Sequence, residues 1–422
     1  MQTHIHRFWI ACVAFASMSG FVVAGDWPRF RGPNGTGVVA DKDVPVEWTE
    51  KNYLWKTPVP GVGHSSPIVH SGRVFLQSAS NDGKERWLLC FDAVKGDMLW
   101  KQPSSGRRAH IHNLNSLASS TPATDGERVY ALFWDGDNIH LNAFNFKNGK
   151  PLWQKDLGGF KSQHGVGHSP IVIDGKVIVA NDQDGSARLL AFDARDGEPL
   201  WQTERKAFRA CYSTPFVREI ENGGKELIVA SSAGVAGYNP ADGKANWWYT
   251  WKFAKAPLRT VASPILANNL IIATSGDGAG DRDIIAVKLG SKGEASRDTL
   301  VWENRKNYPF PYVPCPLARG DYVYSVHDKG VASCHATATG EEMWNERLDA
   351  SGFTASPILV DGKIYAVANN GTVHVLEAAT KYKTLAANKL GERVSSSPAV
   401  ADNRLFVRGE KHLFCIGQPA VK

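Results

Sequence analysis

Short apolar runs separated by turn residues repeat along most of this chain, and residues 169–201 show the pattern most clearly. Apolar runs at 171–173, 177–180 and 189–193 are followed by a last run that begins at Leu200, with Asp174-Gly175 and Asp196-Gly197 among the turns between them. Short runs rich in Val, Ile and Leu with Asp-Gly between them are typical of antiparallel strands joined by tight turns. The stretch therefore predicts a four-stranded meander, which needs neighbours to bury both of its faces.

Two markers show that this unit recurs. A small residue followed by proline opens it, at Ser66, Thr121, Ser169, Thr214, Ser263, Cys315, Ser356 and Ser397, with 41–55 residues between successive openings. A Gly-x-x-x-Trp ends it, with the tryptophan at Trp100, Trp153, Trp201, Trp247 and Trp344; Trp302 ends another unit without the glycine, and one unit offers Leu385 instead. A period of about 40–50 residues carrying four strands is typical of β-propeller blades. The spacing indicates that the tryptophans dock adjacent blades.

The two ends of the chain predict how the ring closes. After Pro398 only three strands follow, whereas residues 53–56 form a strand with no unit before it. Pairing these two leftovers completes an eighth blade and leaves no free sheet edge. We therefore predict an all-β, eight-bladed β-propeller of four-stranded antiparallel blades over residues 53–422. Residues 25–52 form an extension that we expect to pack across one end of the propeller, with Trp27 and Phe30 as anchors.

The leader and the composition bear on where the protein works. Arg7, an apolar stretch from Phe8 to Val23 and the small residues before Gly25 predict a signal peptide at 1–24, cleaved after Ala24. We expect an exported, periplasmic or extracellular protein without a stable membrane anchor, because the apolar stretch is short for a membrane span; a retained anchor is the alternative. A formal net charge of +6 without long basic runs argues against nucleic-acid binding. We expect a monomer.

The mature chain keeps five cysteines, for which we predict no disulfide. Cys90, Cys334 and Cys415 take the same third-strand position in three blades, which predicts small buried side chains. Cys211 and Cys315 precede strands of blades that are not neighbours, which is too far apart for a bridge.

Candidate chemistry gathers in the connectors that precede the first strand of each blade, because in a propeller these lie at the mouth of the central channel. With strands named A to D outward from the axis, the D-to-A connectors and the B–C loops share one face, here called the connector face. Imidazole and guanidinium groups on one face suit an anionic or polar ligand, or a metal, although solvated loop residues give the same pattern. The candidate binding residues are His64, His110, His112, His164, His168, Arg209, Arg259 and Arg393.

The B–C loops of the same face carry acids, and several tryptophans need an explanation of their own. The acids are Asp82, Asp135, Asp137, Asp182, Asp184, Asp277, Asp281 and Asp283. The segment around Asp277–Asp283 lacks the order of a calcium loop and reads as a long hairpin turn. Trp87 and Trp134 lie beside B–C loops, and the cluster of Trp247, Trp248, Tyr249 and Trp251 is a candidate for a partly exposed partner-binding patch.

The repeat AFDARDGEPLW at 191–201 resembles the tryptophan-docking repeat of the pyrroloquinoline quinone (PQQ) propellers, and DWPRFRGPNGTG at 26–37 resembles the start of secreted bacterial PQQ-like repeat proteins. The resemblance spans nearly the whole mature chain and implies the propeller fold. That superfamily includes quinoprotein dehydrogenases as well as catalytically silent propellers, among them a lipoprotein that helps to insert β-barrels into the outer membrane. The chain departs from both: it has no adjacent Cys-Cys pair or matching calcium ligand set, and no clear lipid-attachment cysteine.

Three functions are therefore open. The leading hypothesis is an exported, non-catalytic binding scaffold that needs no cofactor and holds a protein or glycan partner on the connector face. The second is a PQQ- and Ca²⁺-dependent oxidoreductase, in which Arg209 or Arg259 pairs with the quinone carboxylates and a histidine of this face takes the substrate proton. The third is a polysaccharide-binding or polysaccharide-cleaving propeller that uses the acidic B–C loops and Trp87 or Trp134.

Overall fold

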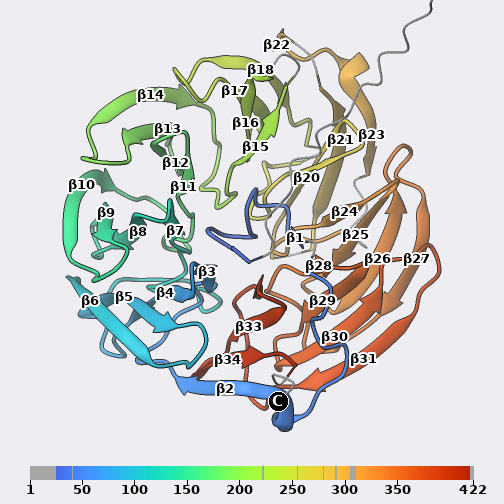
Figure 1. The fold of residues 1–422 in the computed structure, drawn as a ribbon. Coiled ribbons are helices and arrows are strands. Elements are labelled where there is room, and N and C mark those ends of the chain that lie inside the picture. The colour runs from blue at the N-terminus through green and yellow to red at the C-terminus, as the bar shows by residue number, and fades with distance from the viewer. Residues whose placement is uncertain are drawn as a thin grey trace, which may run out of the picture.

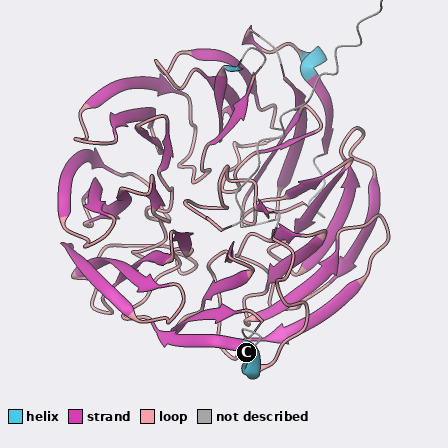
Figure 2. Cartoon of the chain, viewed as in Figure 1, coloured by secondary structure: helices cyan, strands magenta, loops and turns pink. Residues whose placement is uncertain are grey.

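The computed structural model describes residues 25–39, 41–220, 223–253, 255–278, 280–289, 292–304 and 310–418. Within them, eight antiparallel sheets stand around a central axis, and each contains the four strands of one blade (Figures 1 and 2). The eight-bladed propeller predicted from the repeat is confirmed. No helix of the described residues has the length and apolar character needed to span a membrane, and the predicted signal peptide at 1–24 lies outside these residues.

The first four blades take the chain in order. Blade 1 contains β3 (Ile68–His70), β4 (Arg73–Ala79), β5 (Glu85–Asp92) and β6 (Met98–Ser105). Blade 2 contains β7 (Ala123–Thr124), β8 (Arg128–Trp134), β9 (Asn138–Asn145) and β10 (Pro151–Gly159). Blade 3 contains β11 (Ile171–Ile173), β12 (Lys176–Gln183), β13 (Ser186–Asp193) and β14 (Pro199–Arg205). Blade 4 contains β15 (Phe216–Glu219), β16 (Lys225–Ser231), β17 (Gly234–Tyr238) and β18 (Ala245–Thr250).

The remaining blades follow the same plan. Blade 5 contains β19 (Ile265–Ala267), β20 (Leu270–Gly276), β21 (Arg282–Lys288) and β23 (Leu300–Asn304). Blade 6 contains β24 (Leu317–Arg319), β25 (Tyr322–Val326), β26 (Val331–Ala336) and β27 (Glu342–Arg347). Blade 7 contains β28 (Ile358–Val360), β29 (Lys363–Val367), β30 (Thr372–Glu377) and β31 (Thr384–Lys389). Blade 8 contains β32 (Ala399–Ala401), β33 (Arg404–Arg408), β34 (His412–Ile416) and β2 (Tyr53–Pro58), and the short 3-10 helices are η1 (Glu50–Asn52) and η3 (Arg297–Thr299).

Two further strands extend blades in ways that the repeat does not predict. The first, β1 (Val38–Val39), pairs in parallel with the innermost strand β28 of blade 7. The second, β22 (Gly293–Glu294), comes from the long connection inside blade 5 and pairs in parallel with the outermost strand β18 of blade 4. Blades 4 and 7 therefore become five-stranded.

The Gly-x-x-x-Trp marker is explained by contacts between neighbouring blades. The ring of Trp153 lies against Gly197 of the next blade, where an added Cβ would stand 2.6 Å from the indole. Its Nε1–H donates to the carbonyl of Ala194 at 3.2 Å. The same arrangement of ring over glycine recurs at other blade junctions, so the glycine leaves the space that the preceding blade's tryptophan fills. The predicted docking role of these tryptophans thus follows from their geometry.

The buried cysteines complete this junction. The five described cysteines are free and buried. Cys90 pairs across the ladder with Trp100, and Cys334 with Trp344. At the corresponding position the other blades have a small residue such as Ala191, opposite Trp201. A small side chain is needed there because the indole of the outer strand covers that part of the sheet.

The small residue before each proline forms a second set of links, around the axis. The backbone N–H of Ser66 donates to the Oγ1 of Thr121 at 3.1 Å, and the N–H of Thr121 donates to the Oγ of Ser169 at 3.0 Å. Equivalent hydrogen bonds of 2.9–3.1 Å join Thr214 to Ser263, Ser263 to the Sγ of Cys315, Cys315 to Ser356, Ser356 to Ser397, and Ser397 back to Ser66. We call these seven links between described residues the hydroxyl ring; they tie together the inner ends of neighbouring blades at every junction except that between blades 3 and 4.

The ring closes at blade 8 as the leftover strands predicted. β2 from the N-terminal part pairs antiparallel with β34 near the C-terminus (Figure 1). The indole of Trp55 on β2 lies against Gly96 of blade 1, and its Nε1–H donates to the carbonyl of Ala93 at 3.1 Å. The same indole packs on Phe406 of β33 with ring centroids 5.9 Å apart, and the hydroxyl-ring bond from Ser397 to Ser66 also joins the two ends of the chain.

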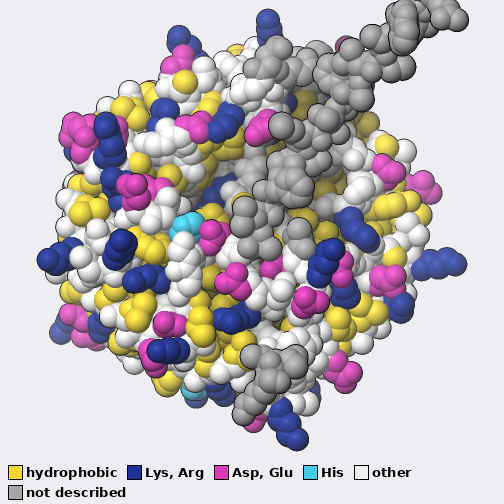
Figure 3. Space-filling view, viewed as in Figure 1, with side chains coloured by type: hydrophobic (Ala, Val, Ile, Leu, Met, Phe, Trp, Pro, Cys, Tyr) yellow, Lys and Arg dark blue, Asp and Glu magenta, His cyan; other side chains and the backbone are white. Residues whose placement is uncertain are grey.

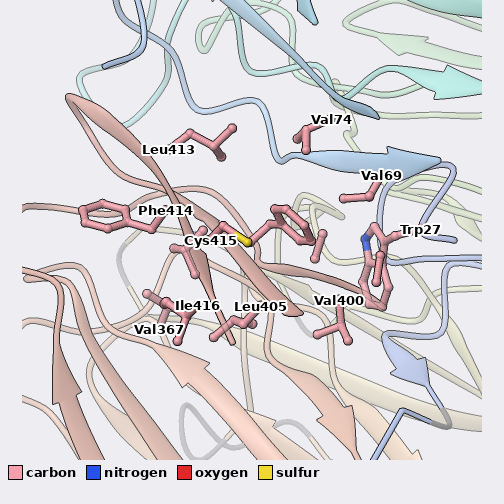
Figure 4. Packing of buried hydrophobic residues seen from close by; sticks show 14 of the residues in the cluster. Trp27, Val69, Val74, Val367, Val400, Leu405, Leu413, Phe414, Cys415 and Ile416 are labelled. Carbon is pink, nitrogen blue, oxygen red and sulfur yellow. The ribbon is translucent and has the colours of Figure 1, made fainter. Parts of the chain in front are cut away.

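Residues 26–39, here called the channel segment, lie at the centre of the ring (Figure 1), where they pair with innermost strands of the blades. The backbone of Trp27 pairs with Val69 in the inner strand of blade 1, and the carbonyl of Pro28 accepts from Thr124 in blade 2. Figure 4 shows the Trp27 indole beside Val69 and Val400, where blades 1 and 8 meet. Trp27 is buried, as expected of an anchor, whereas Phe30 is only half-buried.

Two arginines are the further anchors of the channel segment. Arg29 donates to the carbonyl of Pro215 at 2.8 Å, and Arg31 donates to the carbonyls of Pro316 at 2.7 Å and Pro357 at 3.2 Å. Both side chains are buried, and burial lowers the pKa of Arg29 to about 10. The segment thus contacts the inner strands of blades on opposite sides of the ring and fills the channel from the end at which the A–B turns lie.

Candidate functional site

A cavity of about 800 Å³, here called the connector cavity, opens on the connector face. Its wall consists of the connectors before blades 1, 2 and 8 and of B–C loops from blades 1, 7 and 8. Three of the eight candidate residues line it, namely His64, His110 and Arg393. Arg108, Arg408 and Glu410 also line it, so cationic and imidazole groups outnumber carboxylates.

The most unusual group of this wall is Arg408, at the end of β33. Its side chain is 1% exposed and donates to the carbonyls of Ser65 and Gln77 and to the Oγ of Ser78, while its Nε has no partner among the described residues. None of these partners is a carboxylate. Burial lowers the pKa of Arg408 to about 9, which still leaves the guanidinium charged near neutral pH.

The pKa of His64 reflects its burial and the positive electrostatic potential in this cavity. Burial, followed by the charges of Arg408 and Arg393, lowers the pKa of His64 to about 4. The imidazole is therefore neutral at physiological pH and is held beside two cations. An anion that entered the cavity would offset both charges and favour the protonated imidazole.

Four other candidate residues form a second cluster beside the connector cavity, since His112 lies between Ile111 and Asn113, which line that cavity. The imidazoles of His112 and His164 stack with ring centroids 4.6 Å apart. Burial and then Arg259, His112 and Arg209 lower the pKa of His164 to about 4. Arg259 donates to Gln163 at 3.2 Å and Arg209 to the carbonyl of Pro257 at 3.4 Å, so both guanidinium groups are engaged within the protein.

The last candidate, His168, lies in the core and not at the mouth. Its side chain is 1% exposed, packs against Phe160 with centroids 5.5 Å apart, and has a pKa lowered to about 4 by burial. The predicted set therefore divides into three groups: the connector cavity, the second cluster and this buried imidazole.

The acidic B–C loops serve mainly in local contacts. Asp82 accepts from Ser80, Asp137 pairs with Arg107, and Asp182 lies 3.2 Å from the Nε of Arg205. Among the described residues no three His, Cys, Asp or Glu side chains gather in a way that could hold a metal ion. Figure 3 shows charges of both signs interspersed over the face that it views.

The tryptophans singled out in the sequence differ in how far they are exposed to solvent. Trp87 is 7% exposed and Trp134 is 9% exposed, so neither offers an open platform to a sugar. In the cluster on β18 and after it, Trp247, Tyr249 and Trp251 are buried, and Trp248 alone of the four is exposed.

Sequence reasoning missed Arg408 and the two arginines of the channel segment. Arg408 ends an apolar B strand directly before Gly409. A charged residue at the end of an apolar strand was the feature of the sequence that could have marked it as a candidate. Arg29 and Arg31 bind backbone carbonyls, which carry no sequence signature.

The fold and the face together define a class: tryptophan-docked, eight-bladed propellers that present loops and connectors on one face. The family model described as "Outer membrane protein assembly factor BamB" matches residues 28–163, 140–344, 293–383 and 328–416, and the chain belongs to this family. No curated protein matches the chain closely enough to count as a relative.

Solved structures support the fold alone, since their sequence identities are low. A europium-containing methanol dehydrogenase has a TM-score of 0.68 at 13% identity, covering 92% of this chain and 90% of its own. BamB from Moraxella catarrhalis has a TM-score of 0.57 at 13% identity, covering 91% and 99% respectively. Sqt1 from Saccharomyces cerevisiae has a TM-score of 0.61 at 12% identity, covering 92% and 99%.

Proposed function

We propose that the protein is an exported, non-catalytic binding propeller whose connector cavity receives an acidic segment of a partner protein. The observation that carries the proposal is Arg408, a buried cation whose hydrogen-bond partners among the described residues are carbonyls and a hydroxyl, in the wall of a cavity of about 800 Å³. A buried charge is costly unless it is paired, so a ligand carboxylate that reaches the cavity gains from meeting it.

The surrounding residues favour the same ligand chemistry. Arg108 and Arg393 are exposed and stand where an acidic chain would enter. A guanidinium binds a carboxylate through paired hydrogen bonds, which adds geometric selectivity to charge. The description of the matching family names an assembly factor, and a protein partner is the corresponding expectation for this chain.

The second candidate function is a PQQ-dependent oxidoreductase. The cationic wall would suit the carboxylates of the quinone, but Ca²⁺ needs six to eight oxygen ligands. Glu410 is the one carboxylate that lines the connector cavity. Arg209 and Arg259, the residues expected to bind the quinone, belong to the second cluster. The donor set of the described residues therefore fits an anionic ligand better than a calcium–quinone pair.

Calorimetric titration of residues 25–422 tests both readings. We expect a hexaglutamate peptide to bind saturably with about one site per chain and a hexaglutamine peptide to give no heat. In an NMR titration the same acidic peptide should raise the pKa of His64 from about 4, because a bound anion favours the imidazolium. PQQ with Ca²⁺ should give a flat titration.

Variants on the two faces provide the control. Arg393→Gln and Arg108→Gln should each weaken the acidic peptide by roughly tenfold, the effect of losing one charged hydrogen-bond partner. Arg195→Gln makes the same charge change at the exposed Asp193 pair in a turn on the opposite face and should leave binding unchanged. Equal binding of the acidic peptide by all variants would overturn the proposal. Saturable binding of PQQ would instead favour the oxidoreductase.

A further inference from the structure

A second hollow lies on the same face, farther from the axis, between the outer strands of blades 3 and 4. This rim groove has a volume of about 380 Å³. Its walls come from the end of β14 and the connector that follows, from β17, and from β18, with Glu294 of β22 at the edge. It shares no lining residue with the connector cavity.

Comparison between blades marks Trp248 in this groove as exceptional. The residue directly after the docking tryptophan faces solvent, and elsewhere it is polar: Lys56, Lys101, Gln154, Gln202, Glu303 and Asn345. In blade 4 this position is Trp248, which is 42% exposed. The docking and packing of blade 4 use Trp247 and Tyr249, which are buried, so neither the repeat nor the core requires an indole at 248.

A second exposed aromatic side chain lines the same groove. Phe208, in the connector after β14, is 54% exposed. Among the described Phe, Tyr and Trp residues, Phe208 and Trp248 are the two whose side chains are exposed to solvent. Exposed aromatic rings that face one hollow are typical of a binding site, since leaving them in water forgoes the gain from burial.

The polar lining is balanced in charge. Glu204 and Glu294 oppose Lys206 and Arg205. The side chain of Arg205 is 4% exposed and lies 3.2 Å from Asp182, and its Nη1 has no hydrogen-bond partner among the described residues. The groove therefore offers rings, hydrogen-bond donors and acceptors but no excess of one charge, unlike the connector cavity.

We infer that the rim groove is a carbohydrate-binding site, with Trp248 as the stacking platform and Phe208 beside it. A pyranose ring has an apolar face of C–H groups, which packs on an indole, and an edge of hydroxyl groups, which needs donors and acceptors of both kinds. The ammonium group of the exposed Lys206, the carboxylates of Glu204 and Glu294 and the hydroxyl of Thr250 supply them. The volume lies at the lower end of the range for small-ligand pockets and suits a short stretch of a glycan chain.

The test uses residues 25–422 and a panel of cello-, chito-, manno-, xylo- and galacturono-oligosaccharides, measured by calorimetry and by tryptophan fluorescence. At least one of these probes should bind saturably and shift the fluorescence. Trp248→Gln, which installs the residue found at this place in blades 2 and 3, should weaken that binding by roughly tenfold or more. Its thermal unfolding should stay close to that of the wild type, because the side chain is a surface one.

Leu152→Gln is the matched control, since Leu152 is 48% exposed on the outer strand of blade 2 and lies outside the groove. It should bind the same sugar as the wild type does. Failure of every saccharide in the panel, or equal binding by Trp248→Gln, would overturn the inference. So would a dimer that Trp248→Gln dissociates, because a second copy would then be the occupant. Arg393→Gln should not affect sugar binding, which separates this result from that of the acidic-peptide experiment.

Discussion

Removing the Trp55 side chain should weaken the propeller at the one junction where the two ends of the chain meet. Trp55 is 9% exposed, its indole covers Gly96 of blade 1, and it donates to the Ala93 carbonyl at 3.1 Å. Trp55→Ala removes both the packing and the hydrogen bond. We expect a large loss of stability together with local opening of the closing strand β2.

The magnitude follows from buried area. A tryptophan buries roughly 150–250 Å², which at about 25 cal/mol per Å² corresponds to about 4–6 kcal/mol. That figure is an upper value because the unfolded chain already buries some surface, and aromatic-to-alanine changes in cores cost about 3–5 kcal/mol. The lost hydrogen bond contributes about 1 kcal/mol of this. We therefore expect Trp55→Ala to lower the free energy of unfolding by about 3–5 kcal/mol, measured by urea denaturation.

Trp344→Ala is the matched control for the position in the ring. Trp344 is 8% exposed and donates to Ala379 at 3.0 Å, but it joins blades that are consecutive in the chain. Both variants should lose similar stability. Hydrogen exchange should accelerate in β2 and β34 only in Trp55→Ala, since hydrogen bonds and packing alone, including the contact of Trp55 with Phe406, hold β2 to the other strands of blade 8. Equal exchange there in the two variants, or a stability loss below about 1 kcal/mol for Trp55→Ala, would refute the reasoning.

Three further changes test other parts of the structure. Arg31→Met leaves two prolyl carbonyls without their donor and should lower stability by roughly 2–4 kcal/mol, with earlier tryptic cleavage of the channel segment. Thr121→Val removes the acceptor of the Ser66 N–H in the hydroxyl ring and should cost about 1–3 kcal/mol in urea denaturation. Burial, which outweighs the charge of Arg205, raises the pKa of Asp182 to about 6. The folded protein therefore binds a proton that the unfolded chain has lost, and stability should fall as pH rises from about 4 to 6, by up to roughly 3 kcal/mol; thermal scans of Asp182→Asn should lack that slope.

The fold was predictable because the residues that mark each repeat in the sequence are the ones that make the contacts between neighbouring blades. The small residue before each proline takes part in the hydroxyl ring, with the sulfur of Cys315 in place of one hydroxyl, and the glycine of the Gly-x-x-x-Trp marker lies under a neighbouring indole. The first recurs in all eight blades and the second in five of them, so the period of the sequence is the period of the structure. The channel segment was harder to predict because Arg29 and Arg31 bind main-chain carbonyls, which every residue has.

For the candidate site, the sequence predicted which face of the propeller carries the residues, but not how their side chains group together. The connectors do reach one face, but the position along the axis at which each side chain lies depends on the local path of the chain. His164 and His168 are four residues apart, yet one stacks on His112 and the other is buried against Phe160. The alternation of β18 likewise separates Trp247 from Trp248, and a tryptophan pair in a sequence does not show which of the two faces inward.

Closure of blade 8 by β2 has a consequence for how the protein is made. β2 begins at Tyr53 and its partner β34 ends at Ile416, so a strand that precedes blade 1 in the chain finds its partner only after all the other blades have been synthesised. Until then both edges of the growing array are unpaired strands, which are prone to pair with other chains. Closure of the ring must therefore follow synthesis of the chain through β34, and the interval between synthesis of β2 and of β34 is when this protein would most need the protection of a chaperone.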